Sequence, residues 1–182
     1  MDHHWTRDLF ATAGQRLDVW DHNRSEPVHS LSWGADSLQS VRFNPVEQYM
    51  LASTASDRSV VIYDLRAATP LHKMTMAMKT NCVAWNPMEA FNFVLANEDH
   101  NLYTYDVRRF DTALCVHKDF VSAVLSVDFS PTGKEFVAGS YDRSVRIFRY
   151  NEGRSREVYH TKRMQRIYCA SFSGDARWVM TG

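Results

Sequence analysis

Histidine and aspartate are the residue types in this chain that could carry acid–base chemistry, and the sequence holds eight histidines and 14 aspartates. His117 lies two residues before Asp119, and His100 directly follows Asp99, so either pair could supply a general base and a general acid. These residues recur at or near fixed positions of the repeat described below, which is typical of residues that a fold uses for itself. The motifs H-E-x-x-H and G-x-S-x-G and the glycine-rich phosphate loop are missing from the sequence. We therefore expect no catalytic residues and no enzymatic activity.

The cysteines and the paired histidines His3 and His4 could suggest a metal site. Cys82, Cys115 and Cys169 lie far apart and form no C-x-x-C motif, which is typical of free thiols in a reducing compartment. Two of them, Cys82 and Cys169, stand at a repeat position that serine fills elsewhere in the chain. A small side chain at one packed position explains these two better than zinc does. We expect no metal and no cofactor.

Two quartets of the same type, 42 residues apart, carry arginines that could meet a partner. They are YDLR at residues 63–66 and YDVR at residues 105–108. Strand alternation puts Asp64 on the same side as Arg66, and Asp106 on the same side as Arg108. Each carboxylate can then hold its guanidinium while the arginine projects from the end of the strand. Two interpretations stay open: each arginine braces its own unit, or both arginines bind a partner.

The charge of the chain is unevenly spread, although its net charge is zero. Residues 143–166 hold eight basic and two acidic residues, a net charge of +6 that the rest of the chain balances. The basic residues expected on the surface loops of this stretch are Arg154, Arg156, Lys162, Arg163 and Arg166. Such a cluster is either a solvated face or a patch that contacts phosphate or an acidic partner.

A repeat of about 43 residues positions all of these side chains. One series of aromatics, at spacings of 42, 44 and 43 residues, is Phe43, Trp85, Phe129 and Phe172. A second series, at spacings of 43, 42 and 43 residues, is Trp20, Tyr63, Tyr105 and Phe148. Because two independent series agree on the period, the repeat is unlikely to arise by chance.

Each repeat predicts three or four short antiparallel β-strands. The segments SVRF, MLAST and SVVIYD of one repeat alternate as strands do, and Asn44-Pro45 marks the turn after the first of them. A second turn in each repeat carries an aspartate whose carboxylate can accept neighbouring backbone N–H groups. These turn aspartates are Asp57, Asp99 and Asp142. No stretch shows a sustained helical period, so the fold class is all-β.

Composition and length agree with a soluble globular chain. Hydrophobic residues make up 45% of the 182 residues and charged residues 23%. No apolar run approaches the roughly 20 residues that span a bilayer, and the first residues do not resemble a secretory signal. We expect no membrane contact.

The repeat is similar to the blades of WD-repeat β-propellers, in which Trp20-Asp21, Tyr63-Asp64 and Tyr105-Asp106 would occupy the Trp-Asp position. His117 and His160 would occupy that family's histidine position, and its polar network is expected to be incomplete in every blade. The predicted organisation of this partial propeller is an incomplete blade at 1–35, blades at 36–78, 79–118 and 119–160, and the start of another at 161–182. Counting back from Trp20 predicts that the first blade lacks its inner strand.

Longer motifs, among them WNPMEAFNF and HTKRMQRIYCASFSGDARWVMTG, resemble the Sof-type WD-repeat proteins over the whole chain. The resemblance implies a nuclear and nucleolar scaffold of the small-subunit processome that assists ribosomal RNA processing. It also implies a substrate receptor for a cullin-based ubiquitin ligase, whose adaptor would bind both arginines on one face of the propeller. The docking residues would be Tyr63, Asp64, Arg66, Tyr105, Asp106 and Arg108, with tyrosine in place of the usual tryptophan.

Three functions stay open on the sequence alone. The chain could be a ribonucleoprotein scaffold in which residues 143–166 face RNA, directly or through processome proteins. It could be a ligase receptor docked through its two quartets, and both roles could belong to one protein. The third function is a generic protein-interaction scaffold with neither role. None of the three needs a small-molecule substrate.

Overall fold

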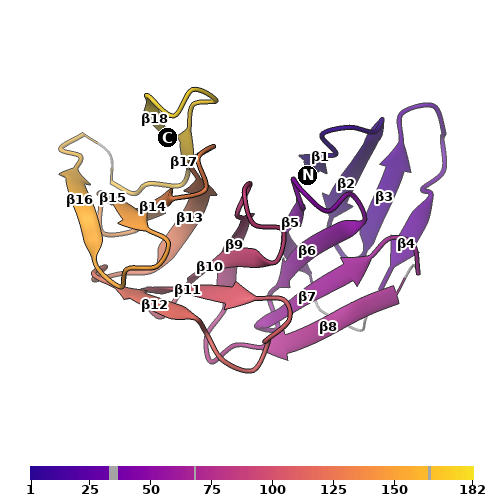
Figure 1. Ribbon diagram of the computed structural model, residues 1–182, viewed down its shortest axis with the longest axis horizontal. Coiled ribbons are helices and arrows are strands. Elements are labelled where there is room, and N and C mark those ends of the chain that lie inside the picture. The colour runs from indigo at the N-terminus through magenta and orange to yellow at the C-terminus, as the bar shows by residue number, and fades with distance from the viewer. Residues whose placement is uncertain (33–36, 68, 164) are drawn as a thin grey trace. The chain divides into compact units, whose positions relative to one another are not determined.

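Every regular element among the described residues is a short β-strand, which confirms the predicted all-β class (Figure 1). The computed structural model describes residues 1–32, 37–67, 69–163 and 165–182. These residues form two compact units, Met1–Thr80 and Asn81–Gly182. The described part of the chain holds no helix of the length and apolarity that a membrane crossing requires.

The first unit contains two four-stranded antiparallel sheets with strands in chain order. The strands of the first sheet are β1 (Asp2–His3), β2 (Leu9–Ala13), β3 (Leu17–Asp21) and β4 (His29–Leu31). Those of the second sheet are β5 (Leu38–Phe43), β6 (Met50–Ala55), β7 (Ser59–Asp64) and β8 (Thr69–Thr75). The predicted boundary between these blades, at residues 35 and 36, lies outside the described residues.

The prediction that the first blade lacks its inner strand is wrong, because β1 is the inner strand of the first sheet. Strand β1 pairs with β2, and His3 lies opposite Phe10. The count back from Trp20 failed because the loops of this sheet are short. The segment from Phe10 to its partner Trp20 is two residues shorter than the segment from Leu51 to Tyr63 in the second sheet.

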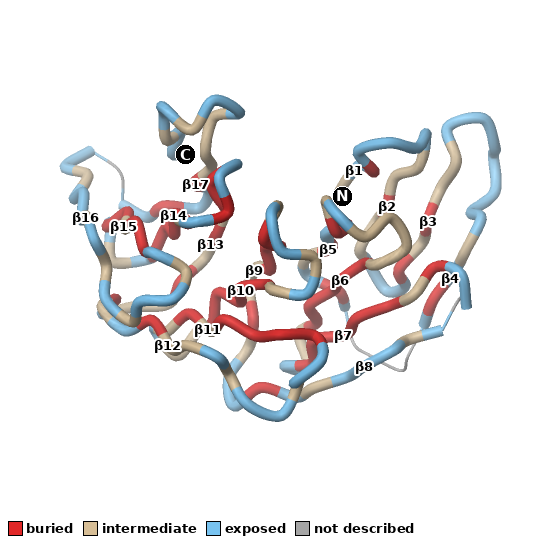
Figure 2. Tube along the Cα trace, in the orientation of Figure 1, coloured by how far each residue is buried: buried red, intermediate tan, exposed pale blue. Residues whose placement is uncertain are grey.

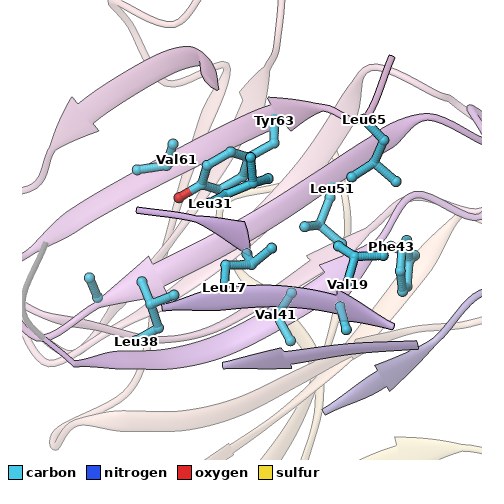
Figure 3. Close-up of a cluster of buried hydrophobic side chains, with 12 residues drawn as sticks. Leu17, Val19, Leu31, Leu38, Val41, Phe43, Leu51, Val61, Tyr63 and Leu65 are labelled. Atoms are coloured by element: carbon cyan, nitrogen blue, oxygen red, sulfur yellow. The ribbon is translucent and has the colours of Figure 1, made fainter. Parts of the chain in front are cut away.

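The apolar core of the first unit lies between its two sheets (Figure 3). Leu17 and Val19 of β3 meet Leu51 of β6 and Val61 of β7, and all four side chains are fully buried. Tyr63 at the end of β7 belongs to the same cluster. The second and third strands of the two sheets therefore share one apolar core.

The second unit contains two four-stranded sheets and one two-stranded sheet, all antiparallel. The first of these sheets holds β9 (Thr80–Trp85), β10 (Asn92–Asn97), β11 (Asn101–Asp106) and β12 (Cys115–Lys118). The next holds β13 (Val124–Phe129), β14 (Glu135–Ser140), β15 (Ser144–Arg149) and β16 (Ser155–His160). The last pairs β17 (Ala170–Phe172) with β18 (Val179–Thr181).

Burial follows the position of each strand in its sheet (Figure 2). The second strands β10 and β14 are buried along almost their whole length, since apolar side chains cover both of their faces. The outer strand β16 is mostly exposed. Polar residues that extend from an outer strand or a hairpin turn are therefore available to partners.

In three of the four-stranded sheets, those that begin with β5, β9 and β13, the hairpin between the second and third strands has the same turn. Its second residue adopts a left-handed backbone, with φ near 70°, at Arg58, His100 and Arg143. The aspartate just before that residue accepts the backbone N–H two positions later, at Ser59, Asn101 and Ser144 respectively. The turn aspartates Asp57, Asp99 and Asp142 thus close these turns with their carboxylates.

Candidate docking site

In the quartet of the first unit, at the end of β7, Asp64 holds the side chain of Arg66 in one orientation. The Asp64 carboxylate accepts two parallel hydrogen bonds from Arg66, with distances of 3.0 Å from Nε to Oδ1 and 2.8 Å from Nη2 to Oδ2. It also accepts the backbone N–H of Arg66 at 2.8 Å. The Arg66 side chain is 60% exposed, whereas that of Asp64 is 14% exposed. The planar ion pair therefore presents a guanidinium to solvent in a fixed orientation.

The quartet of the second unit repeats this geometry at the end of β11. The Asp106 carboxylate accepts Nε of Arg108 at 3.0 Å and Nη2 at 2.7 Å, and the backbone N–H of Arg108 at 2.8 Å. Arg108 is 66% exposed and Asp106 is 11% exposed. Hydrogen bonding and ion pairing with the arginine lower the pKa of Asp64 and of Asp106 below their usual value, so both carboxyls stay ionised at neutral pH.

An aromatic ring completes each quartet, and sequence reasoning missed it. The guanidinium carbon of Arg66 lies 5.0 Å from the ring centre of Tyr49, and that of Arg108 lies 4.8 Å from the ring centre of Phe91. The two rings are 42 residues apart, the same spacing as the quartets, and that was the signal available in the sequence. We call each set of aspartate, arginine and aromatic ring an arginine module.

Tyr63 and Tyr105 are buried in the core beneath the two arginine modules. Both rings are buried, with 2% and 8% exposure, and burial raises the pKa of both phenols. They anchor the strand ends from which Asp64 and Asp106 emerge. The tyrosines at the tryptophan position of the repeat are therefore packing residues, and a partner would meet the arginines first.

The fold does not require an arginine at this position. In the first sheet Asp21 accepts the backbone N–H of Asn23 at 2.9 Å, so the same turn closes without an arginine. In the sheet β13–β16 the residue after the closing aromatic Phe148 is Arg149, which pairs with Glu152 at 3.0 Å. Closing the turn therefore does not explain why Arg66 and Arg108 occupy this position.

A second arginine, Arg7, joins the module of the first unit. Its guanidinium carbon lies 4.4 Å from the Tyr49 ring centre, and its Nη2 donates to the Tyr49 hydroxyl at 2.6 Å. The loop that carries Arg7 is fixed by the buried His4, whose Nε2–H donates to the backbone carbonyl of Gln48 at 2.9 Å. Phe91 has no hydroxyl that could accept an equivalent hydrogen bond in the second module. The expectation that Arg66 and Arg108 share one face concerns two separate units and stays a prediction.

The basic stretch 143–166 divides into a paired part and an unpaired part. Arg154 pairs with Asp119 at 2.7 Å. Arg156 pairs with Glu135 and Glu157, each at 2.8 Å. Three residues of the predicted patch are exposed and form no ion pair with any residue that the structure describes: Lys162, Arg163 and Arg166.

The two histidines at the repeat position differ. His117 is fully buried; its Nδ1 lies 2.6 Å from the carbonyl oxygen of Glu152, and its Nε2 lies 2.8 Å from the Thr104 hydroxyl. Because a carbonyl can only accept, Nδ1 carries the proton and Nε2 accepts from Thr104. His160 is exposed at the end of β16. Part of the polar network expected of WD repeats thus forms around His117. Another part forms in the first sheet, where the Trp20 indole Nε1–H donates to the Thr12 hydroxyl at 3.0 Å.

The acid–base pairs considered from the sequence are not brought together. His117 binds Thr104 and Glu152, whereas the Asp119 carboxylate accepts Ser155 and Arg154. Asp99 accepts the Tyr103 hydroxyl at 2.5 Å, and burial together with this carboxylate raises the pKa of Tyr103 to about 12. His100 projects from the turn beside Asp99 as an exposed residue.

A groove of about 590 Å³ in the second unit is lined by residues of β14, β15 and β16 and of the β17–β18 hairpin. It contains two groups with shifted pKa values, Glu157 and Tyr159. Their mutual hydrogen bond of 2.6 Å lowers the pKa of the carboxyl and raises that of the phenol. Both pKa values therefore shift away from neutral pH, whereas a catalytic acid or base works best with a pKa near the operating pH. Within the described ranges, no three histidine, cysteine, aspartate or glutamate side chains gather as metal ligands.

Several known proteins are similar in sequence to this chain over its whole length. The family WD domain, G-beta repeat matches residues 14–64 and 112–149. The chain is 56% identical to "DDB1- and CUL4-associated factor 13" of Danio rerio and 57% identical to the protein of that name in Homo sapiens, in both cases over 182 residues. It is 54% identical to "Protein SOF1" of Saccharomyces cerevisiae over the same length.

The chain spans 41% of the two vertebrate proteins and 37% of the yeast protein, about two fifths of their length. Each matched segment crosses from one four-stranded sheet into the next: residues 14–64 hold β3 to β7, and residues 112–149 hold β12 to β15. The chain therefore contains WD-type repeats and is similar over its whole length to these WD-repeat relatives.

Proposed function

We propose that this chain is a non-enzymatic interaction module that docks, through its two arginine modules, on the partners in the name of its vertebrate relatives, DDB1 and CUL4. In this role it serves as a substrate receptor of a cullin-based ubiquitin ligase. The observation that carries the proposal is the repeated geometry: a guanidinium held by two parallel hydrogen bonds, set against an aromatic ring and exposed by more than half. Arginine in such a setting is a frequent hot spot of protein interfaces.

The alternative role, bracing each sheet, has less support. An exposed ion pair contributes only about 0–1 kcal/mol to stability. The same turn closes at Asp21 and Asn23 without an arginine. A bracing role also gives no reason for the aromatic ring to recur under both guanidinium groups.

The test replaces both arginines, Arg66→Ala with Arg108→Ala, in the full-length protein. We expect binding to purified DDB1 to be lost, since truncating a hot-spot residue costs about 2 kcal/mol or more. The melting temperature should change by less than about 4 °C, because each lost ion pair contributes at most about 1 kcal/mol. Binding is measured by surface plasmon resonance and melting by calorimetry.

The matched control is Arg149→Ala. Arg149 also follows a closing aromatic and forms an exposed ion pair, with Glu152, yet it lies outside both modules. This variant should bind normally. A well-folded double variant that still binds DDB1 would refute docking through the modules, and a double variant of clearly lowered stability would assign the arginines to bracing.

We further propose a role in small-subunit ribosome biogenesis, with a nucleolar location in the nucleus and with processome proteins as partners. Two observations favour this second role: the 54% identity to "Protein SOF1" and the unpaired basic residues after β16. The role needs only a scaffold, because repeat proteins present loops and strand ends to several partners at once.

A further inference from the structure

Two exposed tyrosines flank a single arginine in the second unit. The guanidinium carbon of Arg166 lies 4.0 Å from the ring centre of Tyr141, and its Nη1 donates to the hydroxyl of Tyr168 at 3.0 Å. Tyr141 is 41% exposed and Tyr168 is 63% exposed. Their rings are therefore held in place by an arginine at the surface and are not packed into the core.

Three segments of the chain meet at this place. Tyr141 and Arg143 belong to the turn between β14 and β15. The N–H of Thr161, just after β16, donates to the carbonyl of Arg143 at 3.1 Å. The N–H of the buried Ile167 donates to the carbonyl of Ser140 at 3.2 Å. Backbone hydrogen bonds thus hold the segment that carries Arg166 and Tyr168 against the turn.

Four cations lie close in the sequence to the two tyrosines and have no carboxylate partner among the described residues. Arg143, Lys162, Arg163 and Arg166 are exposed, and none forms an ion pair with any of the residues described. The nearby carboxylate of Asp142 accepts hydrogen bonds from Ser144 and Val121. The site is therefore strongly cationic. We call the six residues Tyr141, Arg143, Lys162, Arg163, Arg166 and Tyr168 the tyrosine–arginine cluster.

Exposed rings beside unpaired cations match the chemistry of a single nucleic-acid strand. Phosphates bind arginine and lysine, and every base can stack on an aromatic ring or on the plane of a guanidinium. A duplex hides the faces of its bases, and an acidic protein surface would use the cations but would leave the rings without a role. We propose that the tyrosine–arginine cluster binds single-stranded nucleic acid, with a base stacked on Tyr168 and phosphates on the four cations.

The test measures binding of the chain to a fluorescein-labelled uridine 12-mer by anisotropy. The matching deoxythymidine 12-mer, a 12-base-pair RNA duplex and labelled poly-glutamate, which stands for an acidic protein surface, are measured beside it. Tyr168→Ala should weaken binding of the single strand about tenfold, whereas Tyr168→Phe, which keeps the ring, should bind as the natural chain does. Lys162→Gln with Arg163→Gln should lower the slope of log affinity against log salt by about 1.4, because roughly 0.7 counterions are released per phosphate contact.

The control is Arg154→Gln with Arg156→Gln, since these arginines already pair with carboxylates. This pair should leave affinity nearly unchanged. An unchanged affinity of Tyr168→Ala would overturn the stacking site, as would equal or tighter binding of the duplex or of poly-glutamate. Preference for uridine over deoxythymidine would assign the site to RNA, and equal binding of both would still support a single-strand site. All variants are checked for folding by circular dichroism, and the measurement is independent of DDB1 binding.

Discussion

His117 is a buried neutral histidine, and its neutrality matters for stability. Its two ring nitrogens are satisfied by the Glu152 carbonyl and the Thr104 hydroxyl. Burial lowers the pKa of His117 below its usual value of 6.5, because the charged imidazolium would lose its solvation. The unfolded chain therefore binds a proton at this residue more readily than the folded chain does.

The stabilising effect of His117 should depend on pH. It is fully present above about pH 6.5 and is lost progressively as the pH falls below that value, since the folded pKa is lowered. We expect His117→Gln to reduce the free energy of unfolding at about pH 8, and this deficit to shrink as the pH falls to about 5.5. Urea unfolding of both chains across that range measures the effect. A deficit that is constant with pH would show that the buried histidine is not titrating as described.

For single residues, contacts between close neighbours in the sequence could be predicted, whereas contacts between distant residues could not. The bond between each aspartate and the arginine two positions later was predicted, since both partners belong to one strand end. The ion pair of Arg154 with Asp119 was not, because the residues are 35 apart and only the fold brings them together. Two of the five residues of the predicted basic patch, Arg154 and Arg156, thus pair with carboxylates, and binding of a partner by the patch stays a prediction.

In each unit, an aspartate on an inner strand joins one pair of neighbouring sheets. In the second unit Asp128 of β13 accepts the backbone N–H of Phe172 in β17 at 2.9 Å and the hydroxyl of Ser171 at 2.6 Å. In the first unit Asp2 of β1 accepts the backbone N–H of Phe43 in β5 at 2.8 Å. Both aspartates directly precede the last residue of their strand. The contact is thus a repeated link between adjacent sheets.

Removing this link should loosen the sheet β17–β18. Asp128→Ala leaves the Phe172 N–H without its charged acceptor, and hydrogen bonds to charged groups contribute about 1.5–3 kcal/mol. We expect faster hydrogen exchange at the Phe172 amide, measured by NMR, while the Phe43 amide of the other unit is unaffected. Asp2→Ala should give the reverse pattern. If Phe172 keeps its protection in Asp128→Ala, strand pairing with β18 alone holds the sheet.

The strands were predictable from period and alternation, but loop lengths were not. The 43-residue repeat placed the inner strands at the recurring aromatics, as in β5, β9 and β13. It failed for β1, because shorter loops move the strand closer to Trp20 and put His3 in the position of the anchor aromatic. A turn can lose residues with little cost as long as the register of its strands is kept.

For the whole protein, the docking modules and the tyrosine–arginine cluster serve different partners in the roles we propose. The modules present arginines already bound to aspartates, which suits a protein surface that adds contacts to a fixed guanidinium. The cluster presents unpaired cations, whose binding to phosphate releases counterions and depends strongly on salt. The two proposed functions should therefore be separable by mutation and by ionic strength.

The unpaired and the paired residues of the basic stretch should behave differently in the full-length protein. Lys162→Glu, Arg163→Glu and Arg166→Glu together should weaken association with ribosomal precursor particles, and the loss should be greatest at low salt, where cation–phosphate attraction is strongest. Arg154→Glu with Arg156→Glu should have a smaller effect on association, although placing glutamates beside Asp119 and Glu135 should lower stability by about 1 kcal/mol or less per pair. Sucrose-gradient sedimentation at several salt concentrations measures the association, and DDB1 binding by the same variants reports that the docking modules stay intact. If the triple variant sediments with the particles as the natural protein does at every salt concentration, the unpaired cations are only a solvated face, and attachment to the precursor uses other surfaces of the protein.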